Sequence, residues 1–215
     1  MSVNKENYAR IKQELDASAT TLVAVSKIKP ASDIQKLYDL GQRDFGENYV
    51  QELVEKQSQL PADIRWHFIG HLQSNKVKYI APFVHLIHGV TSGSTLKEIS
   101  KQAQKNNRVI DCLLQVHIAQ EETKFGFDAT EIETILSQNE HPNANVIGLM
   151  GMASFSDDLT QVRGEFAALK KLFDKAASIK PGFTTLSMGM SGDYQLAVEE
   201  GSTMVRIGSL LFGTR

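Results

Sequence analysis

The stretch Leu22 to Pro30, LVAVSKIKP, decides how the rest of the chain is interpreted. It begins with four consecutive apolar residues, a run that is typical of a strand covered on both faces, as in a parallel sheet flanked by helices. Lys27 follows at the carboxyl end of this predicted strand. Ligands bind at this edge of α/β sheets, where a lysine beside an apolar wall loses proton affinity and becomes an amine nucleophile. A lysine that reaches into solvent gives the same pattern, so Lys27 alone does not decide between the two.

Outward from this stretch, apolar runs alternate with segments of helical spacing. Eight strands are expected, each followed by a helical segment, and this pattern predicts a closed parallel (β/α)8 barrel, the TIM barrel. Ser32 is the expected cap of the first of these helices. An extra N-terminal helix over about residues 4–16 would pack outside the sheet and cover what a short last helical turn leaves exposed. The predicted strands span residues 22–25, 43–45, 64–69, 84–87, 109–118, 145–150, 184–188 and 203–207.

The composition fits one domain over residues 1–215. Lys and Arg total 23 and Asp and Glu total 25, so the near-neutral charge disfavours nucleic acid or an anionic membrane as the partner. No apolar run is long enough to cross a bilayer, and the polar start carries no secretory signal, so we expect a cytoplasmic protein. Cys112 is the single cysteine, which excludes an internal disulfide and favours an inert buried thiol.

Two glycine-containing turns near the carboxyl end of the chain indicate a phosphate site. Ser191 and Gly192 follow the seventh predicted strand, and Gly208 and Ser209 follow the eighth, each pair directly before a helical segment. Backbone N–H groups and the positive end of a helix dipole converge at such turns, and strands seven and eight carry the usual phosphate position of this barrel. Ser191 as a helix cap and Gly208 as a turn residue are compatible with that interpretation.

Arg206 lies at the end of the eighth predicted strand, next to the first strand once the barrel closes. A buried arginine requires an anionic or acceptor partner, which is either a ligand or a salt bridge with Glu47 or Asp193. A Schiff-base lysine, a phosphate cradle and a buried arginine on adjacent strands together describe a site for a phosphorylated aldehyde.

Six segments then make the sequence recognisable. They are LVAVSKIKP, FGENYVQE, WHFIGHLQSNK, GLMGM, LSMGMSGD and GSTMVRIGSLLFG, in this order over about nine-tenths of the chain. Together they closely resemble the pyridoxal phosphate homeostasis protein family. The resemblance implies a barrel like the N-terminal domain of alanine racemase that binds pyridoxal 5'-phosphate (PLP).

The resemblance also implies a role for each matching residue. Lys27 would hold PLP as a Schiff base and Arg206 would face the pyridine nitrogen, which would keep that nitrogen unprotonated and weaken the ring as an electron sink. Asn48, from FGEN, matches another pocket position, although a helix cap explains it equally well. The phosphate would lie against Ser191, Gly192, Gly208 and Ser209.

Other polar residues carry weaker signals. His67 and His71 are four residues apart, but one is expected on a strand and the other after it, so we expect no metal site; His67 could instead line the pocket. Lys124 matches a lysine of the family in a polar loop, where a solvated side chain is the plainer interpretation.

Three functions remain open at this point. The first is a non-catalytic carrier or regulator, acting as a monomer, that buffers PLP or delivers it to PLP-dependent apoenzymes and so influences vitamin B6 and amino-acid metabolism. The second is an amino-acid racemase of low activity, which needs an acid–base group on each face of the cofactor, and the sequence shows no obvious source for the second. The third is a Schiff-base aldolase acting on a sugar phosphate, which would purify colourless where a PLP protein is yellow.

Overall fold

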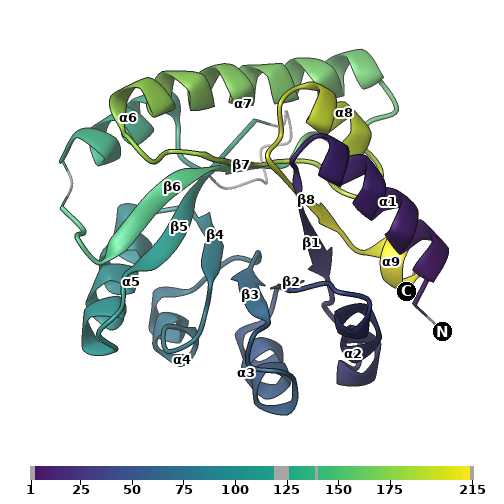
Figure 1. Ribbon diagram of the computed structural model, residues 1–215. Coiled ribbons are helices and arrows are strands. Elements are labelled where there is room, and N and C mark those ends of the chain that lie inside the picture. Colours follow the sequence, from purple (N-terminus) through teal and green to yellow (C-terminus); the bar gives the residue numbers. More distant parts are fainter. Residues whose placement is uncertain (1–2, 119–125, 139, 214–215) are drawn as a thin grey trace.

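Eight parallel strands form a closed barrel in the order β1 to β8 in this computed structural model, which describes residues 3–118, 126–138 and 140–213. Helices surround the strands (Figure 1). The closed (β/α)8 fold expected from the sequence is confirmed. The strands are β1 (Thr21–Val25), β2 (Asp44–Glu47), β3 (Arg65–Phe68), β4 (Leu86–Val90), β5 (Ile110–Val116), β6 (Ala144–Gly151), β7 (Thr185–Ser187) and β8 (Met204–Ile207).

The helices follow the strands with short connections. Most boundaries differ from the sequence expectation by one to three residues, since helix and strand ends depend on hydrogen bonds that periodicity does not show. The helices are α1 (Lys5–Ala17), α2 (Ala31–Asp39), α3 (Val50–Gln59), the 3-10 turn η1 (Ser74–Lys76), α4 (Val77–Ile80), α5 (Gly93–Lys105), α6 (Ala129–Gln138), α7 (Leu159–Ile179), α8 (Tyr194–Glu199) and α9 (Ser209–Phe212).

Three helix caps considered from the sequence were wrong. Tyr49, not Asn48, occupies the position before α3. Ser32 lies inside α2, because the chain turns helical directly after Pro30, whose φ of −67° already suits a helix entry. Asp193, not Ser191, occupies the position before α8. The Oγ of Ser191 instead accepts a hydrogen bond from the N–H of Gly208, 3.2 Å away, and so joins the loops after β7 and β8.

The hydrophobic core has two layers. The larger one lies between the strands and the helices, where α7 contributes Val162, Phe166, Leu169 and Phe173 at helical spacing. A second, smaller cluster of buried apolar side chains is distinct from the larger one. It includes Val23, Leu86, Leu113, Met150 and Met204. Cys112 is buried in the larger layer, as expected, and burial raises the pKa of its thiol.

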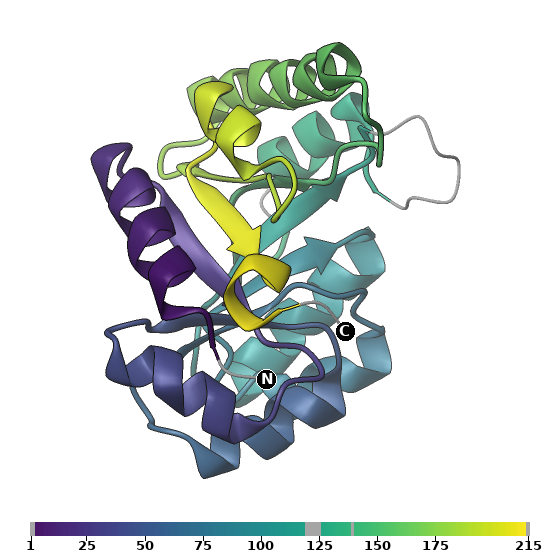
Figure 2. The same cartoon turned by 90° about the vertical axis from the view of Figure 1, so that its right-hand side faces the viewer.

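Helix α1 packs against β1 and the short α9 on the outside of the barrel, as the sequence predicted. The two helices lie side by side (Figure 2). The N–H of Asn4 donates to the carbonyl of Leu211 at 2.8 Å, and the side-chain amide of Asn7 donates to the carbonyl of Leu210 at 3.0 Å. Strand β1 pairs directly with β8, so the barrel closes next to this contact.

Candidate functional site

All seven residues singled out from the sequence line one cavity of about 390 Å³, here called the mouth cavity. A volume of this size is typical of small-molecule sites. The cavity lies where β1, β7 and β8 end, which is the face at which ligands bind in barrels of this kind. The seven residues are Lys27, Asn48, Ser191, Gly192, Arg206, Gly208 and Ser209.

Lys27 lies in a tight turn that follows β1. The N–H of Lys29 donates to the carbonyl of Ser26 at 3.0 Å, which closes the turn around Lys27. Ile28 adopts φ +60°, a left-handed conformation that costs a β-branched residue energy. Its side chain is 58% exposed, so packing against the core does not explain this conformation. Backbone strain of this kind gathers at functional sites.

A buried ion-pair network beneath the turn holds this strained backbone in place. The N–H of Ile28 donates to Glu52 Oε1 at 2.6 Å. The ammonium of Lys56, a buried residue, donates to the same oxygen at 2.6 Å, to Glu47 Oε1 at 2.7 Å and to the carbonyl of Ser26 at 2.8 Å. The hydroxyl of Ser26 donates to Glu47 as well. Burial raises the pKa of Glu47, although Lys56 and Ser26 counteract it. We name Glu47, Glu52 and Lys56 the turn network.

Arg206 is held by neutral oxygens on strands β6 and β7. Its Nη1 donates to the carbonyl of Ser187 at 2.8 Å and to the Oγ of Ser187 at 2.6 Å, and its Nη2 donates to the carbonyl of Gly151 at 3.0 Å. Burial lowers the pKa of Arg206 to about 10, while the charge of Asp193 raises it, so the guanidinium stays protonated near neutral pH. The alternative of a salt bridge between Arg206 and Glu47 is wrong, because that carboxylate pairs with Lys56.

Asn48 contributes an unsatisfied polar atom to the cavity wall. Its Oδ1 is buried and has no hydrogen-bond partner within the described ranges. A buried amide oxygen without a partner costs free energy, which a ligand or water removes by donating to it. The backbone carbonyl of Asn48 lies close to Gly70, where an added Cβ would come within 2.3 Å of that oxygen. A glycine at this position therefore permits the local path of the Asn48 backbone.

The sequence interpretation missed further residues of the cavity wall. Lys29 and Asp193 had a usable signal, since each lies within two residues of a predicted site residue. Phe155 had none, because a fully exposed phenylalanine in a loop carries no pattern of its own. The additional lining residues are Val25, Lys29, Ile69, Met152, Phe155, Met190, Asp193 and Gly213.

The histidines lie elsewhere. His67 does not line the mouth cavity, contrary to one expectation; it is buried, and its ring nitrogens lie 2.9 Å from His88 Nε2 and 3.0 Å from Asp44 Oδ1. Asp44, His67 and His85 offer ligand atoms within 4.8 Å of one another. The guanidinium of Arg65 already contacts both Asp44 oxygens, at 2.7 and 2.5 Å. Lys124 lies outside the described residues.

Comparisons with known proteins show the family of this chain. The family model for the N-terminal domain of alanine racemase matches residues 3–215. The pyridoxal phosphate homeostasis protein of Aquifex aeolicus is 42% identical over 197 residues, which cover 90% of this chain and 86% of that protein. The chain belongs to the pyridoxal phosphate homeostasis protein family.

Other members extend the comparison. The human pyridoxal phosphate homeostasis protein is 40% identical over 229 residues, which cover 98% of this chain and 82% of that protein. The structure of PipY from Synechococcus elongatus with PLP bound superposes with a TM-score of 0.88 at 35% identity and covers 97% of this chain and 99% of PipY. In the part of the chain that the structure describes, no helix has the length and apolar character needed to span a membrane.

Proposed function

We propose that this chain binds PLP in the mouth cavity and takes part in PLP homeostasis. The observation that carries the proposal is the convergence of all seven family-motif residues on a single cavity of about 390 Å³. The name of the family and the PLP-bound state of PipY support it. The donor set also fits the ligand, because the loops after β7 and β8 carry serine hydroxyls and glycine backbone and the turn after the adjacent β1 carries a lysine.

The proposed roles follow from the chemistry of each group. Lys27 would hold PLP through the aldehyde of the cofactor as a Schiff base, with release of water. Ser191, Gly192, Gly208 and Ser209 hold the phosphate. Arg206 would face the ring, where a protonated guanidinium would donate hydrogen bonds and disfavour a proton on the pyridine nitrogen. Asn48 supplies the amide oxygen that lacks a partner within the described residues.

We further propose that the site stores or delivers PLP and is not primarily catalytic. Free PLP is an aldehyde, so a reversible Schiff base keeps it bound and unreactive until an apoenzyme takes it. Racemisation requires an acid–base group on each face of the cofactor. Lys27 would supply the acid–base group on one face. The described lining of the mouth cavity contains no histidine or tyrosine that would supply the group on the other face.

Reduction with borohydride tests the attachment site. The protein is loaded with PLP, reduced and digested, and the pyridoxyl group is mapped by mass spectrometry. We expect the label on Lys27 and its loss in Lys27→Ala. Lys29→Ala is the matched control, since Lys29 lines the same cavity two residues away, and it should keep the label on Lys27. A label on Lys29 or elsewhere in the wild-type protein would refute the assignment.

A transfer experiment tests the carrier role. The absorption spectrum of the PLP-loaded protein is recorded before and after incubation with a PLP-dependent apoenzyme and separation of the two. Movement of the visible band to the acceptor, together with recovered acceptor activity, is the expected result. A band that stays while L-alanine is converted to D-alanine would show the racemase instead. A colourless protein that binds no added PLP would contradict the proposal as a whole.

A further inference from the structure

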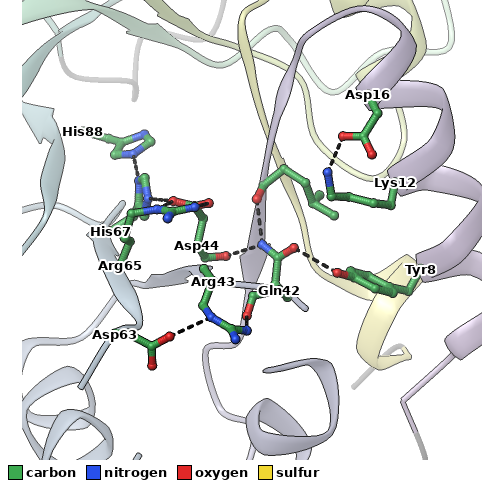
Figure 3. Close-up of polar contacts among 11 residues, drawn as sticks. Tyr8, Lys12, Asp16, Gln42, Arg43, Asp44, Asp63, Arg65, His67 and His88 are labelled. Carbon is green, nitrogen blue, oxygen red and sulfur yellow. Dashed lines mark hydrogen bonds and ion pairs between the residues drawn. The ribbon is translucent and has the colours of Figure 1, made fainter. Parts of the chain in front are cut away.

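A row of buried hydrogen bonds links Arg206 to the opposite side of the barrel. From Arg206 Nη1 to Ser187 Oγ the distance is 2.6 Å, and from that oxygen to His88 Nδ1 it is 3.1 Å. His88 Nε2 lies 2.9 Å from His67 Nδ1, and His67 Nε2 lies 3.0 Å from Asp44 Oδ1. Each of the five residues is at most 7% exposed. Figure 3 shows His88, His67 and Asp44 in succession, with Arg65 beside Asp44.

The two ends of this row, together with a neutral His67, fix the direction of every hydrogen bond in it. A guanidinium only donates and a carboxylate only accepts. Ser187 Oγ therefore accepts from Arg206 and donates its own proton to His88 Nδ1. His88 then donates from Nε2 to His67 Nδ1, and His67 donates from Nε2 to Asp44. All donors find acceptors with both imidazoles neutral and in the Nε2–H tautomer.

The reverse direction would require an additional proton. If His88 donated from Nδ1 to Ser187, its Nε2 would have to accept from His67 Nδ1. The Nε2 lone pair of a neutral His67 would then face the Asp44 carboxylate, so His67 would have to be a cation. Ser187 would also accept from two donors and lose His88 as the acceptor for its hydroxyl proton.

The charges around the row determine the states of His88 and Asp44. Burial lowers the pKa of His88 well below its usual range, and the Arg206 cation lowers it further, so His88 is neutral in both arrangements. Burial alone would raise the pKa of Asp44, but hydrogen bonds from Arg65 and His67 outweigh it and hold that pKa well below its usual range. Asp44 is therefore an anion and an obligatory acceptor at neutral pH.

We propose that Ser187, His88 and His67 are positioning residues for the mouth cavity: they form a hydrogen-bond relay of fixed direction that orients the Arg206 guanidinium and ends on Asp44. Each O–H and N–H dipole of this relay points toward Asp44, so the oxygen lone pair of Ser187 is turned toward Arg206. Dipoles aligned in this way strengthen one another.

The relay lets a distant carboxylate support the charge of Arg206. A carboxylate placed directly beside the ligand would attract a proton to a pyridine nitrogen, whereas Asp44 acts through three neutral side chains from the other end of the relay. This consequence for the ligand rests on the proposed PLP function. The direction of the relay does not, because it follows from the protein groups alone.

Nitrogen-15 NMR of the histidine side chains tests the direction in PLP-free protein. At pH 7.5 we expect Nδ1 of both His88 and His67 to show the shift of an unprotonated nitrogen and Nε2 that of a protonated one. The signals that disappear in His88→Gln and in His67→Gln assign the two rings. An Nδ1–H tautomer or an imidazolium at either ring would overturn the proposal, whether or not the chain binds PLP.

Substitution of Ser187 tests the link to the ligand. Ser187→Ala removes the relay oxygen and keeps the backbone carbonyl, and we expect about tenfold weaker PLP binding together with a changed pH profile of the PLP absorption band. The matched control is Ser202→Ala, a buried serine on the same side whose hydroxyl contacts only backbone carbonyls, and this variant should change neither. Equal effects of the two variants would refute a positioning role.

Variants at His88 distinguish orientation from packing. A glutamine at this position can accept from Ser187 and donate to His67, whereas a leucine of similar size can do neither. We expect His88→Gln to restore most of the PLP affinity that His88→Leu loses. Similar loss in both variants at equal stability would refute the relay, because it would show that only the shape of the imidazole matters.

Discussion

Two cavities of about 390 Å³ each lie near opposite ends of the strands. They differ in the hydrogen-bond and ion-pair partners of their polar groups. The second one, here called the lower cavity, lies beside α1 and the start of β2. Its charged residues form ion pairs: Lys12 with Asp16, Arg43 with Asp63, and Arg65 with Asp44 (Figure 3). In the mouth cavity, by contrast, Asn48 Oδ1 has no partner within the described residues and Arg206 donates to neutral oxygens.

The partners of the polar groups distinguish a stabilising surface from a binding surface, whereas the cavity volumes are equal and do not. Ion pairs within the protein leave few polar groups that a ligand could satisfy. An unsatisfied buried atom and a cation held by neutral groups both lower their free energy when a polar ligand arrives. The substitutions below should therefore affect stability and ligand affinity separately, according to the side of the molecule on which they fall.

The largest effect is expected from Lys56→Met in the turn network. It leaves the fully buried Glu47 without its counter-charge, so the free energy of unfolding should fall by about 3–5 kcal/mol. Lys36→Met is the control, because it removes an exposed ion pair with Asp33 and should cost less than about 1 kcal/mol. Urea denaturation measures both, and similar values for the two variants would contradict a structural role for the turn network.

A smaller effect, on affinity alone, is expected from Asn48→Ala. Removing an unsatisfied amide should leave the free energy of unfolding of the PLP-free protein within about 0.5 kcal/mol or raise it, while PLP binding weakens about tenfold. Equilibrium titration with PLP and thermal denaturation give the two numbers. A large fall in the free energy of unfolding without weaker PLP binding would show that Asn48 stabilises the fold and does not bind the ligand.

The free energy of unfolding should depend on pH because His88 is neutral in the folded protein. Its lowered pKa means that the unfolded chain binds a proton first, so the stability contributed by neutral His88 is present above about pH 6.5 and is lost as the pH falls below it. The loss between pH 7.5 and 5.5 should be about 1–1.5 kcal/mol. Glu47 acts in the opposite sense, since its raised pKa gives stability at low pH that is lost as the pH rises through that pKa.

The contribution of His88 is obtained by subtracting the pH profile of the His88→Gln variant from that of the wild type. The turn network is intact in His88→Gln, so the difference between the pH profiles of wild type and this variant should contain the His88 slope alone. Denaturation at half-unit pH steps measures it. A difference that does not vary with pH between 7.5 and 5.5 would show that His88 is not held neutral.

The smallest effect is expected at Ile28. Glycine relieves the left-handed backbone but loses more entropy on folding, so Ile28→Gly should stabilise the protein by about 0.5–1 kcal/mol. Val109→Gly is the matched control, because Val109 is also β-branched and 58% exposed but does not have a positive φ, and it should destabilise. A loss of stability at Ile28 would show that the turn network imposes no strain.

The sequence predicted the barrel and seven of the residues that line the mouth cavity, but not how the charged groups of the cavity are partnered. Lys27 and Arg206 were predictable because each ends an apolar run, and strands that end at one rim bring their next residues together. The partners of Arg206 were not, since they are a backbone carbonyl on β6 and a serine on β7 that no local pattern connects to it. The same holds for His67 and His88, whose pairing depends on the register between strands.

The pairing of β1 with β8 also has a consequence for how the molecule is made. Lys27 follows the first strand of the barrel and Arg206 lies on the eighth, and at about 5–20 residues per second their synthesis is separated by roughly 10–40 s. During that interval β1 is an edge strand with unpaired N–H and C=O groups, which is prone to aggregation. Only a barrel that has closed can bring the two residues together, so occupancy of the mouth cavity would mark chains whose folding is complete.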